Sequence, residues 1–100
     1  METTQTTQLW SAYVLHISDG KKQDEIAAAA DVNQATVSRW VNARKVPTEA
    51  ANVAYLARAF GRNPLEAFVA AGMLKESEAG KGLSDESRRL LSGLRSRVTT

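Results

Sequence analysis

The stretch that decides the fold covers residues 23–40, QDEIAAAADVNQATVSRW. Four consecutive alanines end its first half, and alanine favours helix strongly while leaving a nearly smooth surface that permits a close helix crossing. Asp31-Val32-Asn33 interrupts the helical pattern, and Asn33 is a good N-cap for a second helix over residues 34–42. The stretch therefore predicts two short helices, over residues 23–30 and 34–42, joined by a turn of only three residues.

The apolar and small positions of this stretch have the spacing of a helix-turn-helix, in which two helices cross over a short turn and bury matched side chains. The predicted inward-facing side chains are Ile26, Ala27, Val32, Val37, Trp40 and Val41. Successive side chains of a helix are rotated by about 100°, and this rotation places polar residues on the opposite face of the second helix. The outward-facing side chains are Ala35, Ser38, Arg39 and Asn42, with Gln34 at the exposed N-terminal end.

These outward-facing side chains suit the major groove of double-stranded DNA, because Gln pairs with adenine, Arg with guanine, and an Ala methyl contacts the thymine methyl. Residues 33–47 also contain three cations and no acid. Loops and helix N-termini beside such a helix meet phosphates. We therefore expect base contacts from Gln34, Ala35, Ser38 and Arg39, and phosphate contacts from Gln23, Asn42, Arg44 and Lys45.

Further helical patterns flank this stretch on both sides, and no segment alternates as a strand does. One helix over residues 9–17 has Thr6 or Thr7 as its N-cap; a second follows Pro47, with Thr48 as its N-cap, and ends at Gly61; a third begins at Asn63-Pro64 and ends near Gly72. The sequence thus predicts an all-α fold, with a compact bundle of five short helices over residues 7–74.

The region over residues 7–74 resembles the Cro and phage-repressor type of helix-turn-helix protein, the XRE family of bacterial and phage transcriptional regulators. The matching pieces are Gln23, Ile26-Ala27, Val32, residues 34–40, and Pro47 followed by LARAFG at residues 56–61. The resemblance implies a bundle of the lambda-repressor-like type that binds palindromic operators as a homodimer. It also implies phosphate binding by Gln23 and base contacts by Gln34, Ala35 and Arg39.

Two positions depart from the family's pattern. Asp31 stands where the family mostly has glycine, and Asp tolerates a positive φ better than most residues. Val41-Asn42-Ala43 stands where the family often has Glu-Asn-Gly, so the usual glycine that stops the helix is missing. The helix over residues 34–42 is therefore free to run further or to end differently, which changes where Arg44 and Lys45 lie.

The C-terminal part of the chain matches no element of that family. Residues 75–82, KESEAGKG, predict a linker by their polar composition and two glycines. Residues 83–100 predict a basic amphipathic helix or tail, in which four arginines accompany an apolar stripe formed by Leu90, Leu91, Leu94 and Val98. We favour burial of this stripe, against the core or as a dimerisation surface; the alternative is a frayed tail that attracts DNA without specificity.

Composition excludes several classes of protein. With no cysteine and one histidine in 100 residues, the chain has no ligands for zinc fingers or iron–sulfur clusters and no cysteine nucleophile. No catalytic constellation or phosphate-binding glycine loop is present, so we expect neither an enzyme nor a cofactor or metal. The first eight residues form a polar lead-in without the features of a signal peptide, and no apolar run is long enough for a membrane span.

The sequence therefore predicts a DNA-binding transcriptional regulator of the bacterial cytoplasm, specific for a double-stranded operator, with no membrane or small-molecule substrate as partner. The resemblance makes it a repressor of phage or prophage kind that acts as a homodimer. The alternative is an antitoxin-like or adaptor module that uses the same fold to hold a protein partner. The net charge of +2 does not decide between them. The acid-free polar segment over residues 33–47 favours DNA, because a protein-binding face is more often apolar at its centre.

Overall fold

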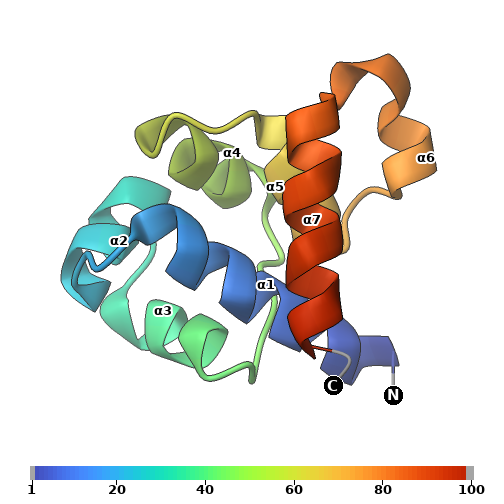
Figure 1. Ribbon diagram of the computed structural model, residues 1–100. Coiled ribbons are helices and arrows are strands. Elements are labelled where there is room, and N and C mark those ends of the chain that lie inside the picture. The colour runs from blue at the N-terminus through green and yellow to red at the C-terminus, as the bar shows by residue number, and fades with distance from the viewer. Residues whose placement is uncertain (1, 99–100) are drawn as a thin grey trace.

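The structure, a computed structural model, describes residues 2–98. Within this range the chain forms seven α-helices and one 3-10 helix, and it has no strand (Figure 1). They are α1 (Glu2–Ser18), α2 (Gln23–Ala30), α3 (Gln34–Val41), α4 (Ala50–Ala59), α5 (Pro64–Ala70), α6 (Glu76–Ala79), η1 (Gly80–Gly82) and α7 (Asp85–Val98). The prediction of a compact all-α fold is confirmed. The count of five helices is wrong, because α6 forms inside the predicted linker and α7 packs into the same bundle.

The first helix begins earlier than predicted. The sequence suggests Thr6 or Thr7 as its N-cap, whereas α1 begins at Glu2. The first eight residues contain neither Gly nor Pro, so no residue there stops a helix. Packing also covers this end, since Thr7 is buried and a Cβ added to Gly72 would stand 2.7 Å from the Thr6 methyl group. From Glu2 onward, the expected polar lead-in is therefore part of the helix.

One cluster of buried apolar side chains takes residues from α1, α2, α3, α4, α5 and α7. Trp10 and Trp40 are 0% and 1% exposed, which confirms the prediction that Trp40 faces inward and adds Trp10 to the core. Their rings meet edge to face with centroids 5.5 Å apart, and Tyr13 stacks on Trp10 at 5.6 Å. Aromatic pairs of this kind contribute about 0.5–1.5 kcal/mol beyond the burial of their surface. Trp40 thereby fixes α3 to α1.

Four successive helices, α2 to α5, end with the same backbone turn. In each, the residue that follows the helix or its cap has a positive φ, and the next N–H bonds a carbonyl five residues back. These bonds are Val32 to Ala27 at 3.0 Å, Arg44 to Arg39 at 2.8 Å, Arg62 to Ala57 at 2.8 Å and Met73 to Phe68 at 2.9 Å. Glycine occupies the positive-φ position after α4 and α5, whereas Asp31 (φ 60°) and Ala43 (φ 57°) occupy it after α2 and α3. Ala43 therefore stops α3 without the usual glycine.

The start of α4 differs from the prediction. Thr48 is exposed and does not cap the helix; the N-cap is Glu49, whose side chain makes no capping bond. The chain runs without helix from Lys45 to Glu49, with Pro47 buried, so α4 begins one residue later than predicted. At the next helix the prediction is correct, because Asn63 accepts a hydrogen bond from the Leu65 N–H at 2.9 Å and Pro64 is the first helical residue.

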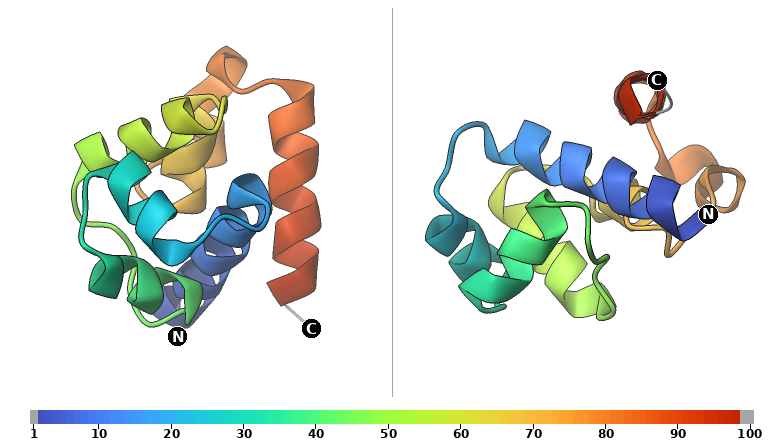
Figure 2. Two further views of the ribbon diagram at one scale, coloured as in Figure 1. Left: turned by 90° about the vertical axis from the view of Figure 1, so that its left-hand side faces the viewer. Right: turned by 90° about the horizontal axis from the view of Figure 1, so that it is seen from below.

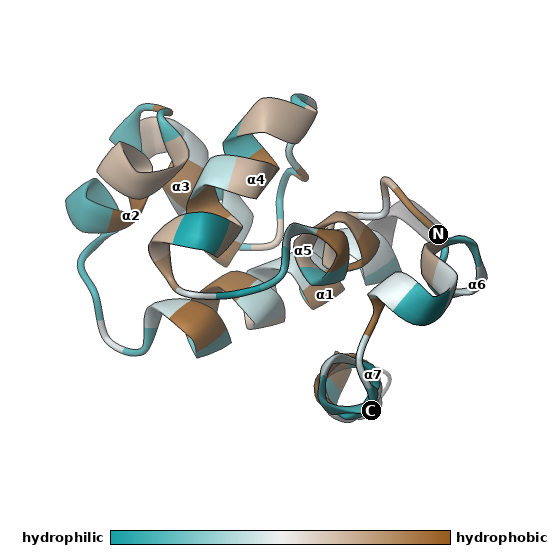
Figure 3. Cartoon of the chain, turned by 90° about the horizontal axis from the view of Figure 1, so that it is seen from above, coloured by the Kyte–Doolittle hydropathy of each residue, from teal (hydrophilic) through white to brown (hydrophobic). Residues whose placement is uncertain are grey.

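The last helix, α7, packs against α1 and α5 and lies on the far side of α1 from α3 (Figure 2). Its hydrophobic and hydrophilic residues occupy different sides of the helix (Figure 3). Leu91 and Leu94 are buried in the common core, whereas Leu90 and Val98 are partly exposed. The apolar stripe of α7 is thus covered in large part by the chain's own bundle.

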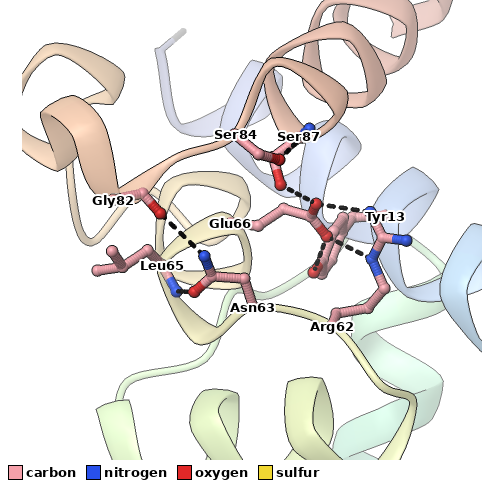
Figure 4. Close-up of polar contacts among 8 residues, drawn as sticks. All are labelled: Tyr13, Arg62, Asn63, Leu65, Glu66, Gly82, Ser84 and Ser87. Atoms are coloured by element: carbon pink, nitrogen blue, oxygen red, sulfur yellow. Dashed lines mark hydrogen bonds and ion pairs between the residues drawn. The ribbon is translucent and has the colours of Figure 1, made fainter.

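A buried carboxylate joins α7 to α1 and α5 (Figure 4). Glu66 is 0% exposed; it accepts hydrogen bonds from the Tyr13 hydroxyl at 2.8 Å, the Ser87 hydroxyl at 2.6 Å and, through two nitrogens, the Arg62 guanidinium at 2.8 and 2.6 Å. Burial raises the pKa of Glu66, but the bonds from Arg62, Ser87 and Tyr13 outweigh burial and hold that pKa below its usual value. Burial and the same carboxylate raise the pKa of Tyr13. Glu66 is therefore a buried, charged carboxylate, and both of its oxygens accept hydrogen bonds.

The connection between α5 and α7 is held by polar contacts at the surface. Glu76 pairs with Arg88 at 3.2 Å and with Arg95 at 2.8 Å, and the Asn63 amide donates to the Gly82 carbonyl oxygen at 2.9 Å. The hydrogen bond from Arg95 is the main cause that lowers the pKa of Glu76. Although its composition is that of a linker, this segment is fastened to the helices on both sides of it.

Candidate nucleic-acid interface

The unit formed by α2, the turn at residues 31–33 and α3 has local reasons for its shape. Asp31 takes the left-handed conformation that ends α2, and Val32 lies half-buried beneath the turn. Asn33 is the N-cap of α3, as predicted, because its side-chain oxygen accepts from the Thr36 N–H at 2.8 Å. The bounds of α2 agree with the prediction, and α3 ends at Val41, one residue earlier than expected.

The two faces of α3 are clearly different. Val37 and Trp40 are buried, and the Ser11 hydroxyl of α1 donates to the Val41 carbonyl oxygen at 2.7 Å. On the other side, Gln34, Ala35, Ser38 and Arg39 are exposed or half-buried. All four predicted base-contacting side chains therefore lie on α3, away from its buried side.

The polar groups of this face differ in how free they are. Within residues 2–98, the side chains of Gln34 and Arg39 form no hydrogen bond or ion pair with the rest of the chain. Asn42, a predicted phosphate contact, is already engaged, since its amide donates to the Ser38 carbonyl oxygen at 2.8 Å and lies 3.4 Å from the Ser38 hydroxyl. Its side-chain oxygen is an acceptor and has no attraction for phosphate. Of the predicted contacts on this face, the side chains of Gln34 and Arg39 are exposed and have polar groups without a partner within residues 2–98.

The predicted phosphate contacts Arg44 and Lys45 follow α3 directly. Both are exposed, and in the part of the chain that the structure describes neither side chain has a hydrogen-bonding or ion-pairing partner. The turn at Ala43 sets their direction, because the Arg44 N–H closes that turn on the Arg39 carbonyl oxygen at 2.8 Å. Two free cations thus border the polar face of α3.

Gln23, the remaining predicted phosphate contact, is half-buried at the first residue of α2. Two exposed acids, Asp24 and Glu25, follow it in the first turn, and the Glu25 carboxylate accepts from the Lys22 N–H at 3.0 Å. Acids at a helix N-terminus stabilise the helix, but they repel a phosphate that approaches the same end. Of the predicted phosphate contacts, Gln23 has the least favourable electrostatic surroundings.

The apolar stripe of α7 lies apart from this face. Leu91 and Leu94 pack inside the chain's own core, and the partly exposed Leu90 and Val98 are on a helix that α1 separates from α3 (Figure 2). Pairing of two chains through this stripe stays a prediction, and it would have to use Leu90 and Val98.

One contact of this unit has no signal in the sequence. Asn52 of α4 donates its side-chain amide to the carbonyl oxygens of Ala30 and Asp31, at 2.9 and 3.3 Å. An asparagine in the first turn of a helix ordinarily suggests a local bond. The bond to α2 depends instead on how α4 packs against that helix, which local patterns do not give.

Comparison of the chain with known protein families, with curated proteins and with solved structures found no match. Within residues 2–98, no group of three or more His, Asp or Glu side chains could hold a metal ion. None of the helices described is both long enough and apolar enough to cross a membrane.

Proposed function

We propose that this chain binds double-stranded DNA in a sequence-specific way, with α2 and α3 acting as a helix-turn-helix of the phage-repressor type. The observation that carries the proposal is the outer face of α3, where Gln34 and Arg39 are exposed and have no partner within residues 2–98. Groups of this kind that are left without a partner in the free protein are available for base edges. Arg to guanine and Gln to adenine each provide about 1–3 kcal/mol of discrimination.

Electrostatics supports the same surface. Arg39, Arg44 and Lys45 lie within a segment, residues 33–47, that has no acid. Cations beside a reading helix attract the phosphate backbone and fix the register without choosing the sequence. Arg44 and Lys45 would therefore set the position of α3 in the groove, while Gln34, Ala35 and Arg39 read the bases.

The size of the molecule supports a pair of such units on DNA. Its extents are 32 × 28 × 23 Å, so even the longest extent is shorter than one turn of the double helix and two copies can occupy successive half-sites without overlap. Symmetric helix-turn-helix dimers read half-sites about 34–36 Å apart, one turn of the double helix. The resemblance to the XRE family supports a homodimeric repressor of phage or prophage kind. Such a regulator would act in the bacterial cytoplasm by occupying an operator, without a cofactor and without catalysis.

The test is selection of binding sequences from a randomised duplex library at moderate salt. A palindromic consensus would support specific binding by a dimer, and a single half-site would indicate a monomer. Binding without enrichment would overturn sequence specificity. No binding would overturn the proposal and favour the antitoxin-like or adaptor alternative.

Two variants separate reading from anchoring on the selected sequence. Gln34→Ala should relax base preference at one position, because only that contact is lost. Lys45→Ala should weaken binding to all sequences alike and lower the slope of log affinity against log salt by roughly one. Identical behaviour of the two variants would contradict the roles assigned here.

A further inference from the structure

Asn52 satisfies the two carbonyl groups at which the chain turns from α2 to α3. Its amide is 2.9 Å from the oxygen of Ala30, the fully buried last residue of α2, and 3.3 Å from the oxygen of Asp31. A helix leaves its last carbonyls without partners inside the helix, and a buried carbonyl without a partner is destabilising. The turn is thus tied to α4 by a bond that spans 22 residues of sequence.

We propose that Asn52 is a positioning residue for the base-reading face, a role that rests on the proposed function. Trp40 and the bond from Ser11 to the Val41 carbonyl fix the C-terminal half of α3 to α1. Two of the residues expected to contact bases, Gln34 and Ala35, lie at the N-terminal end of α3, directly after the turn that Asn52 holds. Asn52 therefore holds the turn from which the N-terminal end of α3, with Gln34 and Ala35, begins.

Loss of this bond should reduce specificity more than total affinity. Hydrogen bonds to base edges weaken steeply when donor and acceptor are misaligned, whereas attraction between cations and phosphates depends little on angle. Arg44 and Lys45 follow the far end of α3, so their attraction to phosphates would survive a loosened turn.

The experiment compares Asn52→Ala and Asn52→Asp with Val53→Ala, using the full chain. Alanine favours helix, so any loss in Asn52→Ala comes from the missing bond. Aspartate keeps the shape but turns a carboxylate oxygen toward two carbonyl oxygens. Val53 is the neighbouring residue, fully buried, and its truncation weakens the core without a bond to the turn. The readout is the ratio of affinities for the sequence that wild type selects and for a random duplex, at one salt concentration and at a temperature where circular dichroism shows every variant folded.

We expect Asn52→Ala to lower that ratio about tenfold, the cost of one misaligned base contact, while Val53→Ala keeps the wild-type ratio. Amide exchange of the Val32 and Thr36 N–H groups in the free protein should also rise in Asn52→Ala and not in Val53→Ala. The positioning role would be overturned by an unchanged affinity ratio in both Asn52 variants, or by an equal loss of that ratio in Val53→Ala. Either result leaves the proposed function standing as long as wild type binds a specific sequence. If wild type selects no sequence, the proposed function fails, and the reading role of Asn52 fails with it.

Discussion

The segment of α3 with its following loop and the helix α7 both combine an apolar stripe with several cations, but they differ in their surroundings. Each has an apolar stripe on the core and several cations on the other side. On α7, Arg88 and Arg95 already pair with Glu76. Around α3, the side chains of Arg39, Arg44 and Lys45 have no such acid within the described residues. The comparison teaches that a count of cations along a segment does not show which of them acids of the same chain already neutralise.

The two segments are also held by different forces. Trp40 anchors α3 through aromatic contact, Ser11 donates to the carbonyl oxygen of its last residue, and Asn52 donates to the end of α2 and the turn before α3. α7 is joined to the bundle through Ser87 and the buried charge of Glu66. Breaking a buried charge pair is costly, since a charge is left in a low dielectric without its partner. Electrostatics therefore stabilises α7 within the fold, whereas the cations around α3 are paired with no acid within residues 2–98.

The largest expected effect is on the attachment of α7. Glu66→Gln keeps the size of the side chain but removes the charge that Arg62, Tyr13 and Ser87 surround. We expect it to lower the free energy of unfolding by about 3 kcal/mol, the lower end of the range for a broken buried pair, because the Arg62 side chain is 26% exposed and keeps some solvation. Urea denaturation measures this change.

The matched control is Glu76→Gln, the same substitution at a carboxylate that is partly exposed and pairs with Arg88 and Arg95. Surface pairs contribute about 0–1 kcal/mol, so this variant should be nearly as stable as wild type. Equal losses in the two variants would show that burial of Glu66 does not determine the attachment of α7.

Acidification should remove the advantage that the Glu66 charge provides. The pKa of Glu66 in the folded chain lies below its usual value, because the bonds from Arg62, Ser87 and Tyr13 outweigh burial. The stabilisation is therefore complete above the unfolded-state pKa of about 4.3 and is lost as the pH falls through the folded-state value. The difference in unfolding free energy between wild type and Glu66→Gln should be constant from pH 7 to about 5 and narrow below that. A difference that stays constant in acid would contradict a charged Glu66.

The effect expected to be next in size is a loss of DNA affinity. Arg39→Ala should weaken binding to the selected sequence by about 1–3 kcal/mol, the value of one bidentate base contact. Arg95→Ala removes the same charge from α7, where the guanidinium already bonds Glu76, on a helix that α1 separates from α3 (Figure 2). It should leave the affinity nearly unchanged at fixed salt. Fluorescence anisotropy with a labelled duplex measures both variants, and equal losses would mean that net charge alone attracts DNA.

The all-α class, the bounds of α2 and the starts of α3 and α5 could be predicted from sequence because they follow from local causes: the alanine run, the Asn33 cap and the Asn63-Pro64 start. The division of α3 into buried and exposed sides could also be predicted, since Val37 and Trp40 recur at helical spacing. Contacts between distant segments could not. Glu66 bonds Tyr13 and Ser87, and Asn52 bonds Ala30, at separations of 53, 21 and 22 residues. No local pattern indicates which distant group a buried polar side chain meets.

The smallest expected effect concerns the turn that follows α3. Ala43 holds a φ of 57°, which costs a residue with a Cβ roughly 1–2 kcal/mol, whereas glycine reaches it freely but loses more entropy on folding. We expect Ala43→Gly to raise the free energy of unfolding by about 1 kcal/mol, measured by thermal denaturation. The exposed Ala28→Gly inside α2 is the control and should lower it by about the same amount, because its backbone is helical. If the free energy of unfolding rises in Ala43→Gly and falls in Ala28→Gly, the left-handed turn at Ala43 is populated in solution. Arg44 and Lys45 then lie beside α3 as in the structure. A loss of stability in both variants would mean that α3 continues past Asn42, which would move the two cations that set off this segment from α7.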